Sequence, residues 1–82
     1  MPDPPPSDAL NARPITTLWK LGWEGATVAC VIYRNHAGLQ LRLESPTGTI
    51  MNEPFEMQPR MFARSHALRD SLKRRGWQDV PA

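Results

Sequence analysis

Few side chains of this sequence could do chemistry, and they are far apart along the chain. Cys30 lies within the apolar run ATVACVIYR, and the two histidines, His36 and His66, are separated by thirty residues. A reactive thiolate needs a nearby base and an electropositive, partly exposed setting, which a strand of this kind does not offer. A zinc site needs about four ligands, and no second cysteine or carboxylate cluster accompanies the histidines. We expect Cys30 to be buried and inert, and we predict no metal site.

Paired carboxylates are the remaining source of catalysis, because one can act as an acid while the other acts as a base. Glu53 and Glu56 flank Pro54 and Phe55, but a chain of 82 residues leaves little material for a pocket around them. The sequence also has no glycine-rich phosphate loop. We therefore predict that the protein is not an enzyme, with no catalytic residue, no cofactor and no small-molecule substrate.

The composition predicts one small domain in a reducing compartment. A core of this size has limited stability, to which an oligomer or a partner would add buried surface. The single cysteine cannot form an intrachain disulfide. The start, MPDPPPSD, is acidic and proline-rich where a signal peptide is basic and then apolar, and no apolar run reaches the roughly 18 residues that span a bilayer. We expect a soluble cytoplasmic protein with no membrane partner.

The chain divides into a tail and a domain. Residues 1–14 hold five of the nine prolines and, apart from Met1, one large apolar side chain, so this segment cannot bury enough surface to offset the entropy of ordering it. We expect a disordered proline-rich tail over residues 1–14, one domain over 15–78 and a flexible C-terminus over 79–82.

Three segments of the domain are predicted strands. Residues 15–23 and 26–34 are rich in β-branched and aromatic residues, and Glu24-Gly25 joins them as a two-residue hairpin connection. In residues 39–44, leucines alternate with polar residues. The turns set a register that gathers the apolar side chains on one face. The expected pairs are Trp23 with Ala26, Leu21 with Val28, Trp19 with Cys30, Thr17 with Ile32, Ile32 with Leu41, and Cys30 with Leu43.

A short fourth strand and a helix complete the prediction. Residues 49–52 can add a strand with Ile50 beside Leu43, and Pro54 should end the sheet. Between Pro59 and Trp77, apolar or small residues recur at helical spacing, and they are Met61, Ser65, Leu68 and Leu72. We predict an α+β fold, an antiparallel three- to four-stranded β-meander with one C-terminal α-helix packed on one face. The inner layer should comprise Trp19, Leu21, Val28, Cys30, Ile32, Leu39, Leu41, Leu43, Ile50, Met61, Leu68 and Leu72.

The same register predicts an apolar outer face. A contiguous apolar patch on an uncovered sheet commonly marks an interface, although single apolar side chains can also be covered by a tail or by their neighbours. Our first hypothesis is a non-enzymatic protein-interaction module, working as a homodimer or as a subunit of a larger complex. Its contact residues would be Leu18, Val31, Tyr33, Arg42 and Met51.

The predicted helix carries most of the positive charge. Its cations could bind phosphates, so the alternative hypothesis is a nucleic-acid-binding regulator that uses Arg60, Arg64, Arg69, Lys73, Arg74 and Arg75. Cations near a helix C-terminus also complement the helix dipole and keep a small protein soluble, and the chain has no recognised nucleic-acid motif. An enzyme accessory or a weak hydrolase is a third hypothesis.

Trp23 at the hairpin tip and Trp77 after the helix should meet at one end of the domain.

Several segments together resemble a group of small uncharacterised bacterial domains. The segments are LWKLGWEG, VACVIYRNHAGLQLRLES, TGTIMNEPFEM and LKRRGW, and they cover about residues 18–77. Such domains run Leu-Trp-Arg/Lys-Leu, a hairpin, a Gly-Trp-Glu-Leu-Arg-type strand, a short strand after Gly and a helix that ends in Lys-Gly-Trp. This sequence departs from them at Leu39, where they often have Trp, and in its basic helix. The resemblance implies the meander-plus-helix fold and no established activity.

Overall fold

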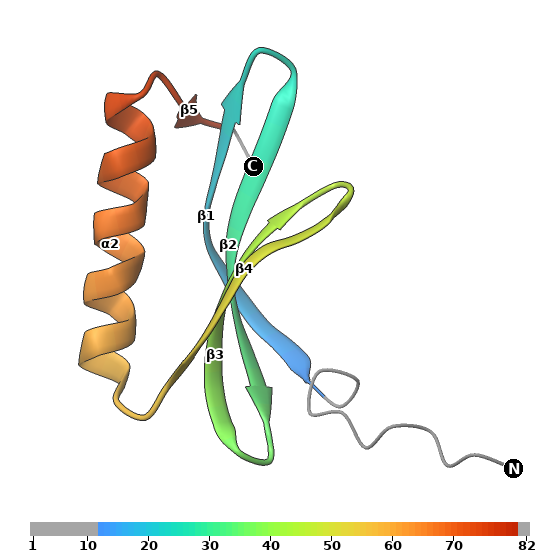
Figure 1. Ribbon diagram of the computed structural model, residues 1–82, viewed down its shortest axis with the longest axis vertical. Coiled ribbons are helices and arrows are strands. Elements are labelled where there is room, and N and C mark those ends of the chain that lie inside the picture. Colours follow the sequence, from blue (N-terminus) through green and yellow to red (C-terminus); the bar gives the residue numbers. More distant parts are fainter. Residues whose placement is uncertain (1–11, 81–82) are drawn as a thin grey trace, which may run out of the picture.

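The computed structural model describes residues 12–80, which form an antiparallel sheet with one helix against one face (Figure 1). The strands are β1 (Arg13–Trp23), β2 (Ala26–Asn35), β3 (Gly38–Ser45), β4 (Gly48–Phe55) and β5 (Gln78–Asp79), and the helix is α2 (Gln58–Arg74). The described strands lie in the order β4-β3-β2-β1-β5. The predicted α+β meander with one C-terminal helix is confirmed. The predictions for residues 1–11 and 81–82 lie outside the described residues.

The hairpin register agrees with the sequence pattern near the turns. Glu24 and Gly25 have φ values of 48° and 82°, as a two-residue hairpin turn of type I′ requires. The predicted pairs that β1 makes with β2 nearest this turn are confirmed, from Trp23 opposite Ala26 to Trp19 opposite Cys30. The two predicted pairs between β2 and β3 are confirmed as well.

A β-bulge in β1 overturns the pairing expected farther from the turn. Thr17 lies opposite Val31 instead of Ile32, while Trp19 still lies opposite Cys30, so Leu18 is an extra residue on its strand. Leu18 is half-buried and packs against the core cluster. The prediction that Leu18 belongs to a free outer surface is therefore wrong.

A second bulge, which lies in β4, reverses the burial predicted for two neighbouring apolar residues. Leu43 lies opposite Met51 and Glu44 lies opposite Thr49, so Ile50 is the extra residue. Met51 consequently packs against the core, whereas Ile50 is 62% exposed. The predictions that Ile50 is a core residue and that Met51 points outward are both wrong. The strand also continues through Pro54 to Phe55, because on an edge strand the missing N–H of proline can face away from the sheet.

The core lies between the sheet and α2. Its buried apolar residues are Leu21, Val28, Cys30, Ile32, Leu41, Leu43 and Met61, with Trp19, Leu39, Leu68 and Leu72 among the half-buried residues around them. Ser65 is the one polar member of the helix stripe, and its Oγ accepts a hydrogen bond of 2.8 Å from Trp19 Nε1. The bond satisfies two polar groups that would be costly to bury unpaired.

The C-terminal segment pairs with β1 through backbone hydrogen bonds, which the sequence did not indicate. β5 pairs with Leu21 and Gly22, and the Val80 amide donates to the Lys20 carbonyl at 3.0 Å. Asp79 also accepts hydrogen bonds from Lys73 Nζ at 2.7 Å and from Arg69 at 2.8 Å, which fastens β5 to α2. Asp79 and Val80 are thus held in place, where a flexible C-terminus was expected.

Asp79 should make stability depend on pH in the acid range. Hydrogen bonds from Lys73 and then Arg69 lower the pKa of Asp79 below its usual value of 3.8. A carboxyl with a lowered pKa in the folded state stabilises that state above its unfolded pKa and stops doing so as the pH falls through its folded pKa. Asp79→Asn should lower the Tm at pH 7, and the difference from wild type should vanish at strongly acid pH.

Thermal unfolding followed by circular dichroism over a pH series measures this effect. Asp70→Asn is the matched control, because it removes a carboxylate of α2 that forms none of the ion pairs found among residues 12–80. A difference between Asp79→Asn and wild type that stays constant from neutral to strongly acid pH would show that the ion pairs of Asp79 contribute nothing.

Candidate functional site

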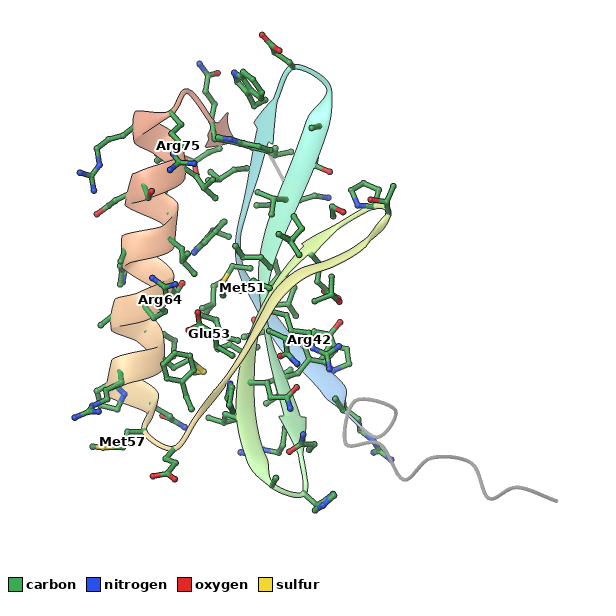
Figure 2. All side chains as sticks on the ribbon, in the orientation of Figure 1. Arg42, Met51, Glu53, Met57, Arg64 and Arg75 are labelled. Atoms are coloured by element: carbon green, nitrogen blue, oxygen red, sulfur yellow. The ribbon has the colours of Figure 1, made fainter. Side chains whose placement is uncertain are left out.

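The outer face of the sheet carries three of the five residues predicted for protein interaction. Val31, Tyr33 and Arg42 lie on the side opposite α2, and Figure 2 shows Arg42 projecting away from the helix. Val31 is only 6% exposed. The face is therefore not the continuous apolar patch expected from the sequence.

A network of polar side chains organises this face. The Arg42 guanidinium lies 4.0 Å from the centre of the Tyr33 ring, and its Nη2 donates to Gln40 Oε1 at 3.2 Å. The Tyr33 hydroxyl donates to Glu44 Oε2 at 2.8 Å, and this hydrogen bond is the main reason why the pKa of Tyr33 is raised. Arg42 Nε is buried and has no hydrogen-bond partner among the described residues. The outer network, as we call Tyr33, Gln40, Arg42 and Glu44, holds an aromatic ring and a guanidinium in fixed positions.

The sequence pattern places all four residues of this network on the outer face, but it does not show the bonds between them. Tyr33 and Arg42 were predicted as contact residues, and Gln40 and Glu44 were expected on the same face beside them. Their spacing of two and four residues on β3 was the available signal, because such residues share one face of a strand. The predicted pair of Ile32 with Leu41 also places Tyr33 opposite Gln40, but the hydrogen bond from Tyr33 to Glu44, four residues farther along β3, does not follow from that register.

Three of the six cations predicted for nucleic-acid binding form ion pairs with two carboxylates of the sheet. Arg64 pairs with Glu53 of β4 at 3.1 Å, and Figure 2 shows these two side chains facing each other between helix and strand. Arg69 and Lys73 both pair with Asp79. Arg60, Arg74 and Arg75 form no ion pair among residues 12–80, so the charge that is available to a ligand lies at the two ends of α2.

The candidate groups for catalysis stay apart. Cys30 is fully buried, and desolvation raises the pKa of its thiol although the sulfur lies 3.8 Å from Ser65 Oγ. Glu53 is engaged by Arg64, while Glu56 is exposed beyond the end of β4. Within residues 12–80, no three histidine, cysteine or acidic side chains lie close enough to hold a metal ion. In the same part of the chain, no helix has both the length and the apolar character needed to cross a membrane.

Trp23, beside the β1–β2 turn, and Trp77, after the end of α2, lie against each other as predicted. The rings of Trp23 and Trp77 have centroids 6.0 Å apart and are tilted by 38°. Gly76, with φ of 108°, ends the helix and lets the chain turn so that Trp77 reaches the hairpin. Trp23 remains 46% exposed.

A hollow of about 650 Å³ lies where the β2–β3 turn, the end of β4 and the start of α2 come together. Its walls include the apolar side chains of Leu39 and Phe55, the exposed Met57, and the polar residues Asn35 and Arg60. Asn35 was predicted only as part of a turn. In the folded chain it is 9% exposed, and its Nδ2 has no hydrogen-bond partner among the described residues.

No family model, curated protein or solved structure matches this chain. The resemblance to small bacterial meander-plus-helix domains therefore stays a prediction, and the surfaces described above are the basis for its function.

Proposed function

We propose that this chain is a small non-enzymatic protein-interaction module that pairs with a second copy of itself through its outer sheet face. The observation that carries this proposal is the outer network, in which Arg42 stacks on Tyr33 with its Nε desolvated and unpaired. Tyrosine and arginine are the residues that dominate binding energy when they are rigidly held near the centre of an interface. Because these two side chains are already fixed, little side-chain entropy is lost when a partner binds.

The charges of the outer network favour a second copy as the partner. Arg42 and Glu44 are two positions apart on β3 and lie on the same face. A two-fold axis places the same patch on both subunits, so Arg42 of each copy can face Glu44 of the other. Ile50, which is 62% exposed and adjoins Glu44 through the β4 bulge, supplies an apolar contact beside these charges.

The edges of the sheet are less suited to self-association than its face. Pairing with another chain needs a regular row of unpaired N–H and C=O groups. β4 is interrupted by the bulge at Ile50 and by Pro54, which has no N–H to donate. The part of β1 before Leu21 has no strand on its outer side among residues 12–80, but register shifts at Ile15 and Leu18 interrupt it. These interruptions favour contact through the face.

Nucleic-acid binding is the second candidate function, and one observation favours it. Arg74 and Arg75 form no ion pair among residues 12–80, and they directly precede Gly76, which lies close to the exposed Trp23. Cations next to an exposed aromatic ring are the usual combination for holding a single strand by its phosphates and stacked bases. Such binding would weaken steeply as salt is added.

Sedimentation equilibrium of the full chain, with and without a short oligonucleotide and at two salt concentrations, tests both candidates. We expect a mass that rises with concentration from 9.3 kDa toward twice that value, without any need for the oligonucleotide. Tyr33→Ala should weaken the dimer by at least about fivefold, the effect of losing an interface residue worth more than about 1 kcal/mol. Phe62→Ala is the control, because it removes an exposed aromatic ring from α2, away from the outer face. A wild-type chain that stays at 9.3 kDa at every concentration would contradict the proposal.

A further inference from the structure

A second hollow, of about 430 Å³, lies at the other end of the domain, where the β1–β2 turn meets the chain that follows α2 (Figure 1). Its volume lies within the range of small-molecule sites, roughly 300 to 1,000 Å³. Its walls include Trp23 and Glu24 at the hairpin, Gly76 after α2 and Gln78 of β5, and we call it the tryptophan hollow. No residue of the outer network lines it, so a ligand bound here would act independently of self-pairing.

Trp23 gives this hollow an aromatic surface that is held in place. The ring packs against Trp77, with the centroids 6.0 Å apart, yet Trp23 stays 46% exposed. Gly76 lies against the other atoms of the indole, since a Cβ at this position would be 3.4 Å from Trp23 Nε1. Because Trp77 and Gly76 already support the ring, little side-chain entropy is lost when a ligand packs on its exposed part.

The charges that border the hollow favour a cation. Glu24 lines it and forms no ion pair among residues 12–80. Its φ of 48° is one that asparagine or glycine adopts with less strain, so the turn bears a cost at the residue that supplies this carboxylate. Gly76 follows the helix C-cap residue Arg75, which places the hollow beside the negative end of the α2 dipole.

Two cations of α2 oppose a positively charged ligand, but neither of them lines the hollow. The Arg74 side chain turns back along the helix, where its Nε donates to the Asp70 carbonyl at 3.3 Å. Arg75 directly precedes Gly76, and Figure 2 shows it at this end of α2. Glu24 is therefore the one charged side chain of the hollow wall, and it would repel the phosphates that the second candidate function requires.

We propose that the tryptophan hollow binds a quaternary ammonium group, the chemistry presented by choline or by a trimethylated lysine side chain. The methyl groups would pack on the indole of Trp23, because the electron-rich face of tryptophan attracts a cation that lies within about 6 Å of the ring centre. The positive charge would lie beside the Glu24 carboxylate. A primary ammonium is more strongly hydrated and would lose more on leaving water, so methylation favours binding.

Choline and 3,3-dimethylbutan-1-ol are the probes, because they have the same shape and differ only in the charged nitrogen. Titrated into the ¹⁵N-labelled full chain, choline should bind with a Kd on the order of 10 mM, as expected of so small a ligand, and should shift the indole N–H signal of Trp23. The alcohol should bind at least about fivefold more weakly, because it lacks the attraction of a cation to the ring. Equal affinity for the two probes, or no shift at Trp23, would overturn the proposal.

Four variants locate the interaction. Trp23→Leu keeps an apolar side chain without the ring, so it should abolish the preference for choline over the alcohol. Glu24→Gln should weaken choline binding and Arg75→Gln should strengthen it, each by about twofold to fivefold, while binding of the neutral alcohol stays constant. Glu56→Gln is the matched control, because it removes an exposed carboxylate at the other end of α2. A choline affinity that is the same in wild type, Glu24→Gln and Trp23→Leu would refute the assignment.

Three further titrations identify the source of the group. N-acetyl-trimethyllysine amide carries it on a side chain and phosphocholine carries it on a lipid headgroup, and the one that binds more tightly indicates the natural ligand. N-acetyl-lysine amide, which lacks the methyl groups, should bind more weakly than its trimethylated form. A chain whose Trp23 signal shifts with a short oligonucleotide but not with choline would support the second candidate function and overturn this proposal.

Discussion

Replacing Leu41 with alanine should lower the free energy of unfolding by about 3 kcal/mol, because this side chain is fully buried between the sheet and α2. A chain of 82 residues is expected to have only roughly 4 to 12 kcal/mol of stability in total. The Tm should therefore fall by roughly 15 °C, and part of the population should be unfolded at physiological temperature. Urea unfolding and thermal unfolding at low protein concentration, where a dimer would not contribute, measure both quantities.

Ile50→Ala is the control for this prediction, because the β4 bulge leaves Ile50 exposed. It should change stability by less than about 0.5 kcal/mol, as most surface substitutions do. Without the bulge, Ile50 would lie beside Leu43 in the core and its truncation would cost as much as other buried truncations. A large loss of stability in Ile50→Ala together with a small loss in Leu41→Ala would contradict the sidedness of the sheet.

The parts of the fold that follow from local patterns could be predicted. Leu39, Leu41 and Leu43 alternate with polar residues, and Glu24-Gly25 suits a tight turn, so strand and register near the turn follow from period and turn chemistry. Pro59 at the first turn and Gly76 after the last turn mark the ends of α2 within two residues of their positions. These signals act over a few residues, which is why they can be read without the fold.

The parts that depend on contacts across the fold could not be predicted. Ile50 and Met51 are both large and apolar, so alternation does not say which one faces α2, and a bulge decides it. The two residues of β5 have little strand propensity of their own. Their position depends on Arg69 and Lys73 of α2, which donate hydrogen bonds to the Asp79 carboxylate. The sequence shows such ion pairs only as charges on separate elements.

The candidate sites divide in the same way. Tyr33 and Arg42 could be placed on the outer face from strand parity, but the stacking of one on the other reflects a diagonal contact between β2 and β3. Asn35 could be placed in a turn from the sequence NHAG. Its unpaired Nδ2 and the hollow beside it arise only when the end of β4 and the start of α2 close against that turn.

Reversing either charge of the outer network should abolish pairing of the chain with itself. In a two-fold dimer, Arg42→Glu brings four carboxylates together and Glu44→Arg brings four guanidinium groups together, because each subunit contributes residues 42 and 44. Like charges in contact cost several kcal/mol, so each variant should dimerise at least about 100-fold more weakly than wild type. Arg34→Glu is the matched control, since it makes the same charge change on β2 at an exposed residue whose register partner on β3, Leu39, packs against the core.

An equimolar mixture of Arg42→Glu and Glu44→Arg tests the self-pairing of the outer face most directly, since the two variants are complementary only to each other. Sedimentation equilibrium of the mixture should give a mass near twice 9.3 kDa, while each variant alone stays near 9.3 kDa. A mixture that sediments as monomers, or a single variant that still forms dimers, would contradict the outer face as the interface.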